Sequence, residues 1–330
     1  MGISGPHITT SISKGVVAVS RADGEITVSD VGRVIEAART VALPPNREIL
    51  HVIPRSYVVD GQEKIDDPVG MTGIRLEVEA LVVSGATSAI KNLTKCIFQA
   101  GLEIDDLVFA PLATGYTFLT KKQKEIGVGL LDIGGGTTSL VVFEEGDILH
   151  AAVLPIGSGL ITNDLAIGLR TSIETAEKIK INYASAIPDK IRESETVSLA
   201  QFDAGETEKI EKKYISEIVQ ARLGEIYSLV ANELKTIGKD GMLPAGVVLT
   251  GGGSKLEDLI EATKDYLRLP AEIGKQNFEL GGFVDKLGDP VYATSVALML
   301  YSFEHSQSSF SPSEPGILGK AKGFLKHLLP

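Results

Sequence analysis

The sequence has no tryptophan and a single cysteine, Cys96, among its 330 residues. One cysteine excludes a framework of internal disulfides and fits a reducing compartment, and we expect Cys96 to be a small buried side chain. No run approaches the roughly 20 apolar residues that a membrane-spanning helix needs, and the amino terminus lacks the pattern of a signal peptide. Basic residues are also few, and the net charge of -11 argues against nucleic acid as a partner.

Hydrophobic residues make up 43% of the chain, which is enough for the cores of two domains of ordinary size. In the first 88 residues the patterns predict a strand in KGVVAVS, a helix capped by Ser29 that ends near Pro44, and two further strands. Strand and helix then alternate, and helical patterns dominate residues 159–239. The sequence therefore predicts an α/β fold with a mostly helical subdomain.

Glycine is concentrated in two turns that each follow an apolar strand, LDIGGGTTS at residues 131–139 and TGGGS at residues 250–254. Backbone N–H groups in such turns can point into one small volume, and a phosphate chain is the usual ligand there. A tight hairpin that needs positive φ angles is the alternative for the first turn taken alone. Two such turns indicate two halves of one cleft.

The first turn would supply amides and hydroxyls from Gly134, Gly135, Gly136, Thr137 and Thr138. Asp132, just before the turn, could hold Mg²⁺ through water or orient an attacking water, which makes it the candidate catalytic residue. The second turn would let a purine or ribose lie against Gly251, Gly252, Gly253 and Ser254.

Two charged residues lie between the turns on a predicted helix. Glu177 and Lys180 are three positions apart in ETAEKIK, so they project from one face. A solvated charged surface is the alternative to a role in the cleft.

The last 15 residues, GILGKAKGFLKHLLP, place their apolar side chains within one arc of a helix and contain no acidic residue. After the Ser- and Pro-rich segment SQSSFSPSEP, this pattern predicts an interfacial anchor for an anionic membrane surface. A helix that docks on the protein's own core or on a partner is the alternative. The residues expected to contact the membrane are Ile317, Leu318, Lys320, Lys322, Phe324, Leu325, Lys326, Leu328 and Leu329.

Three segments, GVGLLDIGGGTTSLVVF, ITNDLAIGLRTSIETAEKIK and GVVLTGGGSKLEDL, resemble the bacterial cell-division family FtsA, which belongs to the actin, chaperone and sugar-kinase superfamily. The resemblance extends over nearly the whole chain and implies an actin-like fold with an inserted strand-helix-strand-strand subdomain called 1C. The implied parts are subdomain 1A at 1–6 and 89–126, 1C at 7–88, 2A at 127–158 and 229–303, helical subdomain 2B at 159–228, a flexible linker at 304–315 and the membrane-targeting helix at 316–330.

Family members also have a first phosphate loop before the point equivalent to Ile3, and this sequence contains no match to it. Subdomain 1A is therefore expected to be incomplete, and a fragment, a misplaced start and a natural short form all stay open. Ser139 stands where the family often has Asp, which argues against a second acidic catalytic group.

The resemblance implies ATP and Mg²⁺ as ligands, with the glycine turns, Glu177 and Lys180 around the nucleotide and weak or no ATPase activity. It implies a cytoplasmic protein, peripheral on the inner face of the membrane at the division site, that tethers the FtsZ ring, forms filaments and recruits other division proteins. The carboxy-terminal peptide of FtsZ would bind subdomain 2B. The alternatives are an ATPase or phosphotransferase of the same fold and a pilus-assembly relative such as PilM.

Overall fold

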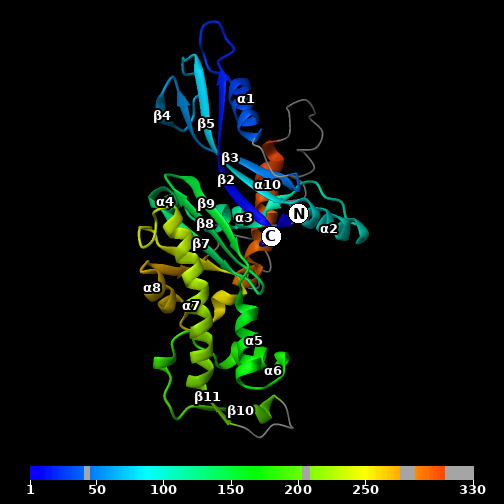
Figure 1. The fold of residues 1–330 in the computed structure, drawn as a ribbon, viewed down its shortest axis with the longest axis vertical. Coiled ribbons are helices and arrows are strands. Elements are labelled where there is room, and N and C mark those ends of the chain that lie inside the picture. The colour runs from blue at the N-terminus through cyan, green and yellow to red at the C-terminus, as the bar shows by residue number, and fades with distance from the viewer. Residues whose placement is uncertain (41–44, 203–208, 276–286, 309–330) are drawn as a thin grey trace, which may run out of the picture.

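The computed structural model describes residues 1–40, 45–202, 209–275 and 287–308. A five-stranded mixed sheet forms the centre of the body (Figure 1). Its order is β13 (Ala271–Ile273), β12 (Val247–Thr250), β7 (Val128–Ile133), β8 (Thr138–Glu144) and β9 (Asp147–Leu154). Strands β13, β12 and β7 are parallel, while β7, β8 and β9 form an antiparallel meander.

Helices cover both faces of this sheet, which explains why its central strands are continuous apolar runs. Leu131 of β7 faces one core with helices α5 (Ser158–Gly168), α6 (Ile173–Tyr183), α7 (Lys212–Thr236) and α8 (Leu259–Leu267). Its neighbour Leu130 faces the other core with α3 (Ala110–Phe118) and α10 (Ala293–Ser308). The short helix α4 (Lys121–Ile126) precedes β7.

The lower part of the body is mostly helical, as the sequence indicates (Figure 1). The antiparallel pair of β10 (Thr196–Ser198) and β11 (Lys209–Glu211) lies at the lower end of this region. Helix α7 follows β11 and leads back toward the sheet beside α5 and α6. An ion pair ties α7 to α5, because Nε and Nη2 of Arg222 donate to the two carboxylate oxygens of Asp164 at 2.6 and 2.8 Å.

A separate antiparallel sheet forms the upper part of the molecule (Figure 1). Its order is β2 (Ile8–Ala18), β5 (Arg75–Ala86), β3 (Arg47–Val59) and β4 (Gln62–Ile65). Helix α1 (Val28–Arg39) packs on one face so closely that a Cβ atom on Gly15 would lie 2.1 Å from the carbonyl oxygen of Val34. Strand β2 begins at Ile8, before the segment from which the sequence predicted it.

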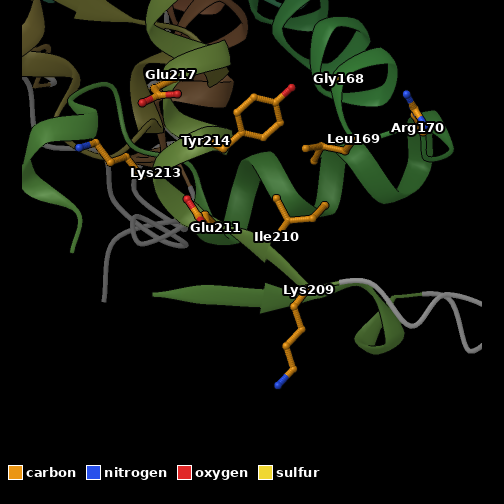
Figure 2. Close-up of a pocket in the computed structure, with 9 residues that line it drawn as sticks. All are labelled: Gly168, Leu169, Arg170, Lys209, Ile210, Glu211, Lys213, Tyr214 and Glu217. Carbon is orange, nitrogen blue, oxygen red and sulfur yellow. The ribbon is translucent and has the colours of Figure 1, made fainter. Parts of the chain in front are cut away.

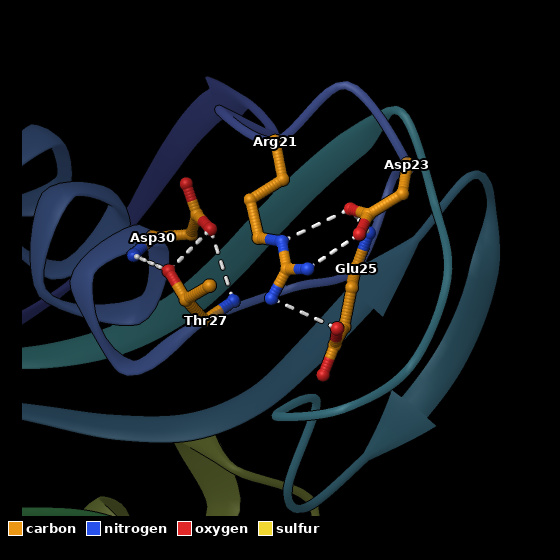
Figure 3. A network of polar contacts seen from close by, with 5 residues as sticks. All are labelled: Arg21, Asp23, Glu25, Thr27 and Asp30. Carbon is orange, nitrogen blue, oxygen red and sulfur yellow. Dashed lines mark hydrogen bonds and ion pairs between the residues drawn. The ribbon is translucent and has the colours of Figure 1, made fainter.

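The cap of α1 differs from the prediction. Thr27, not Ser29, is the N-cap residue, and Thr27 and Asp30 form a reciprocal capping box. Asp30 is fully buried and accepts hydrogen bonds from Ser20, Thr27 and Arg33. Figure 3 shows the Thr27–Asp30 capping box beside a second cluster, in which Arg21 pairs with Asp23 and Glu25. The sequence placed the cap on the wrong hydroxyl because both Thr27 and Ser29 precede the apolar pattern.

The upper sheet leads into the body through α2 (Thr87–Gln99) and the parallel pair of β1 (Gly2–Ile3) and β6 (Val108–Phe109). Cys96 is exposed on α2, so the expectation of a buried thiol is wrong. Helix α10 continues to Ser308, past residue 304 where the linker was expected to begin. The rest of that linker and the predicted anchor at 316–330 lie outside the described residues. No helix in the described ranges is long and apolar enough to cross a membrane.

Candidate functional site

The turn between β7 and β8 is held by the start of α5. The N–H groups of Ser158 and Gly159 donate to the carbonyl oxygens of Gly134 and Gly135, both at 2.8 Å. The approach requires glycine at position 157, where a Cβ atom would lie 2.6 Å from the Gly135 oxygen. With its carbonyl groups directed to α5, the turn has a fixed orientation.

The opposite side of the turn is open. A Cβ atom on Gly135 or Gly136 would meet no atom of the described residues within 4 Å, and one on Gly134 would approach only Thr137. None of the three glycines has the positive φ angle that a strained hairpin would require. Their lack of side chains therefore leaves room outside the turn, and that answers why the sequence places three glycines in succession.

The second turn packs directly against the first. Thr250 at the end of β12 lies opposite Asp132 at the end of β7. A Cβ atom on Gly251 would lie 2.3 Å from Oδ1 of Asp132, so this glycine is needed for contact between the turns. Gly252 has more room, since its nearest neighbour would be Cγ2 of Val291 at 3.6 Å.

Two adjoining cavities lie where the turns meet. The first, of about 390 Å³, is lined by Ser4, Ala110, Pro111, Asp132, Gly134, Gly135, Thr137, Ser139, Gly251, Gly252, Val291 and Thr294. The second, of about 400 Å³, is lined by Ile133, Gly135, Ser158, Ile161, Glu177, Lys180, Ile181, Leu223, Gly252, Gly253, Lys255, Leu256 and Val291. They share Gly135, Gly252 and Val291, so the two predicted turns border both cavities. We call the pair the cleft.

Asp132 is the only carboxylate among the residues that line the first cavity in the described part of the chain. Burial raises the pKa of Asp132 above its ordinary value, and a hydrogen bond of 3.0 Å from Oγ1 of Thr294 to Oδ2 opposes that shift. The described residues hold no group of three His, Cys, Asp or Glu side chains that could bind a metal ion. A Mg²⁺ ion here would therefore depend on one carboxylate, water and ligand phosphates, which is its common mode of binding.

Glu177 and Lys180 lie at the second cavity and contact each other. Nζ of Lys180 is 2.7 Å from the Glu177 carboxylate and donates to Oγ1 of Thr162 at 2.8 Å. Thr162 in turn donates to Glu177. Burial alone would raise the pKa of Glu177, but the hydrogen bonds from Lys180 and Thr162 outweigh it and hold the pKa below its ordinary value. The pair is thus a fixed polar wall of the cleft, not a freely solvated charged surface.

Three predicted residues do not face the cleft as the sequence suggested. Gly136 lines a neighbouring hollow between α5 and α6. The Thr138 side chain is fully buried in β8, and its hydroxyl has no hydrogen-bond partner among the described residues. Ser254 donates to the carbonyl oxygen of Gly251 at 2.7 Å, so it closes its own turn. The sequence analysis missed Val291, Thr294 and Lys255, because only the folded chain brings them to the cleft.

Comparisons with known proteins relate the chain to one family of proteins. A family model described as cell division protein FtsA matches residues 129–297, and one described as an SHS2 domain inserted in FtsA matches residues 5–84. The chain is 39% identical to FtsA of Pseudomonas aeruginosa over 96% of the chain and 75% of that protein. It is 37% identical to FtsA of Bacillus subtilis over 93% of the chain and 68% of that protein.

Two solved structures show the fold. The PilM-PilN type IV pilus biogenesis complex matches with a TM-score of 0.62 at 18% identity, over 91% of this chain and 78% of that chain. MreB5 of Spiroplasma citri bound to ADP matches with a TM-score of 0.51 at 17% identity, over 68% of this chain and 66% of that chain. At these low identities the structural likeness is evidence for the fold alone, and it confirms the expected actin-like architecture. The family-model match of residues 5–84 confirms the inserted domain.

Proposed function

Because this chain belongs to the FtsA family of cell division proteins, we propose that it binds ATP in the cleft and tethers the FtsZ ring to the cytoplasmic membrane. The main observation in support of ATP binding is that two glycine turns far apart in the sequence border the same pair of cavities. The stronger similarity to FtsA proteins favours this function over that of PilM, whose likeness at 18% identity concerns the fold.

The phosphates of ATP would occupy the first cavity. Its wall includes the open side of Gly135 and the hydroxyl-bearing Thr137, and the first residues of α3, α5 and α10 border the cleft. Helix N-termini favour negative charge. The adenosine would occupy the second cavity, between Gly252 and the Glu177–Lys180 pair. MreB5 of Spiroplasma citri, which shares the fold, has been solved with ADP bound.

Asp132 would hold Mg²⁺ through water beside the phosphates, and the ion would neutralise phosphate charge. Ser139 lies opposite Asp132 in the β7–β8 pairing and places a hydroxyl where a second carboxylate would favour hydrolysis. We therefore assign ATP the role of a ligand for conformation and assembly, with weak or no turnover. Steady hydrolysis that depends on Asp132 would instead favour the ATPase alternative.

The carboxy-terminal peptide of FtsZ would bind the helical lower part, residues 159–228. A hollow of about 540 Å³ lies there between the end of α5 and the start of α7 (Figure 2). Tyr214, whose side chain is 45% exposed, faces Leu169 across it, and Arg170 and Lys213 lie at its rim. Three basic residues line the hollow, against the two acidic residues Glu211 and Glu217. An exposed aromatic ring in a lining with this small excess of basic groups suits a peptide that carries both apolar and acidic residues.

Titration of an FtsZ carboxy-terminal peptide against the chain tests this partner. Tyr214→Ala should weaken binding about ten-fold or more, because it removes an aromatic anchor. Tyr292→Ala is the matched control, since Tyr292 is similarly exposed but lies outside the helical lower part. Equal weakening by both changes, or by neither, would move the binding site away from this hollow.

Membrane attachment would come from residues 316–330 and filament formation from contacts between protomers. We assign one such contact to the upper domain, residues 7–88, whose described residues contain no group of three His, Cys, Asp or Glu side chains that could hold a metal ion. Other division proteins would be recruited to the assembled filament. Deletion of the upper domain should therefore reduce self-association in sedimentation and leave ATP binding in place.

A further inference from the structure

The segment that leads into α10, together with the first turn of that helix, borders the cleft through three separate contacts. We define residues 289–294 as the lip, which comprises the 3-10 turn Pro290–Tyr292 and the first residues of α10. We propose that α10 is a coupling element: a Mg·nucleotide in the cleft releases the lip, and α10 carries that change toward the carboxy-terminal end of the chain. The inference rests on the proposed nucleotide site and adds a route by which binding of nucleotide in the cleft affects the carboxy-terminal end of the chain.

The first contact uses the carboxylate that the nucleotide's metal would need. Oγ1 of Thr294 donates to Oδ2 of Asp132 at 3.0 Å, and both side chains border the first cavity. A hydrated Mg²⁺ ion would draw the carboxylate oxygens to its own water ligands. The water ligands of the metal and the Thr294 hydroxyl would then share one carboxylate, so a bound Mg·nucleotide would weaken the hydrogen bond that ties α10 to β7.

The second and third contacts lie on the nucleoside side. Val291 sits over Gly252 and borders both cavities, so a ligand that fills the cleft touches it. Lys255, which lines the second cavity, pairs with Asp289 at 2.6 Å. Both partners are substantially exposed, and exposed ion pairs contribute little stability, so this contact is easily exchanged. A ligand can thus replace these contacts of the lip, whereas Ala293 is buried in the core with α3 and anchors the start of α10.

Helix α10 leads from the lip along the body. It packs against α3, where Tyr301 lies near Tyr116, and the first residues of α3 border the same cavity. Figure 1 shows α10 running from the level of the central sheet toward the base of the upper domain. A continuous helix is a rigid secondary element of the kind that can carry a displacement between two sites. The described part ends at Ser308, immediately before the segment that precedes the predicted membrane helix.

A single tryptophan provides a clean reporter, because the chain contains none. Phe303→Trp places it on α10 at a side chain that is 63% exposed. We expect its emission to change as Mg·ADP is added, with the midpoint that calorimetry gives for binding. By reciprocity, Thr294→Val should raise the affinity for Mg·ADP about five-fold and should remove most of the emission change.

Two further variants separate this coupling from a structural role. Thr294→Ser keeps the hydroxyl, so its affinity and its emission change should match those of the reporter protein alone. Ser295→Val places a valine at the exposed neighbouring position and should also leave both measurements unchanged. A structural role for Thr294 would lower, not raise, nucleotide affinity. Lower or unchanged affinity in Thr294→Val with the emission change preserved would overturn the inference.

The outcome for the reporter protein alone distinguishes the two proposals. Calorimetric binding of Mg·ADP without any change in tryptophan emission would overturn the coupling role of α10 and leave the nucleotide site standing. No calorimetric binding by a folded chain would overturn the nucleotide site and the coupling together. Circular dichroism establishes that each variant is folded.

Discussion

Gly253 lies against Ile133 so closely that a Cβ atom on Gly253 would fall 2.5 Å from Cγ2 of Ile133. The contact joins the turn that follows β12 to the end of β7, and these two strands are parallel neighbours in the central sheet. One glycine turn is therefore positioned by the other. The cleft between them is a property of their packing and does not require a ligand to bring them together.

Gly253→Ala should destabilise the folded body, because the added methyl group must displace Ile133 or the backbone of β7. Overpacking of this kind costs about 1–3 kcal/mol, so the urea midpoint should fall. Gly252→Ala is the matched control, since its Cβ atom would make only ordinary contact with Val291 at 3.6 Å. Equal stabilities for the two variants would contradict the account of the packed turns.

Lys180→Met should weaken adenosine recognition with little effect on phosphate recognition. Lys180 is largely buried and fixes Glu177, Thr162 and the carbonyl oxygen of Ser158 around the second cavity. Loss of these hydrogen bonds to a charged group should lower the affinity for Mg·ATP about ten-fold or more. Calorimetry with Mg·ATP and with Mg·triphosphate measures the difference. Equal losses for both ligands would place Lys180 at the phosphates instead.

Because of Asp30, the stability of the upper domain should decrease at acid pH. Hydrogen bonds from Thr27 and Arg33 hold the pKa of Asp30 well below its ordinary value of 3.8. The folded state therefore binds fewer protons than the unfolded state, so this stability is complete above about pH 4 and is lost as the pH falls through the lowered pKa. Asp30→Ala should lose about 2–4 kcal/mol at neutral pH, because it removes one half of the capping box of α1 and the buried acceptor that Ser20, Thr27 and Arg33 share.

Urea denaturation of wild type and Asp30→Ala between pH 3 and pH 7 measures this effect. The gap between the two proteins should narrow toward acid pH. Asp23→Ala serves as the control, since Asp23 lies in the same loop but pairs with Arg21 on the surface (Figure 3). A constant gap at every pH would mean that Asp30 acts through packing and not through its charge.

The sequence predicted the parts of the cleft that are local in the chain. Glycine runs after apolar strands are recognisable because no other residue leaves the backbone so open, and Asp132 is adjacent to one of them. Thr294 could not be found in this way, since its role depends on packing between a late helix and β7, and a threonine in an apolar helix has no distinctive pattern. The role of Ser254 is not decided by its place in the sequence, because a hydroxyl next to a glycine turn serves a turn hydrogen bond, as it does here, as readily as a ligand.

The fold was predictable where periodicity is strong and less so at its boundaries. The apolar runs of β7, β8 and β12 indicate strands buried on both faces, and the structure places them at the centre of the sheet. The environment of Cys96 was predicted wrongly, because its helix α2 has only Ile90 buried among its residues. General preferences of cysteine could not reveal that α2 exposes most of its surface.

Two contributions to membrane binding by the predicted helix, burial of its apolar side chains and the charge of its lysines, can be tested separately. Phe324→Asp with Leu328→Asp should release the protein from vesicles at any salt concentration, since each large side chain buried in the interface contributes about 1.5–3 kcal/mol. Lys320, Lys322 and Lys326 changed together to Gln should weaken binding mainly to anionic vesicles, at about 1 kcal/mol for each charge. Cosedimentation with vesicles of varied anionic content measures both. Undiminished binding by the double Asp variant would favour a helix docked on protein.

The affinity of Gly135→Ala for Mg·ATP tests the central claim most directly. The Cβ atom would enter open space, so the folded state should be as stable as wild type or slightly more stable, while the methyl group would occupy the position proposed for the phosphates. Gly32→Ala is the matched control, because its Cβ atom also meets open space, on α1. We predict that calorimetry gives at least a ten-fold loss of affinity for Gly135→Ala and none for Gly32→Ala. Unchanged binding by Gly135→Ala in a folded chain would contradict a nucleotide site between the two glycine turns.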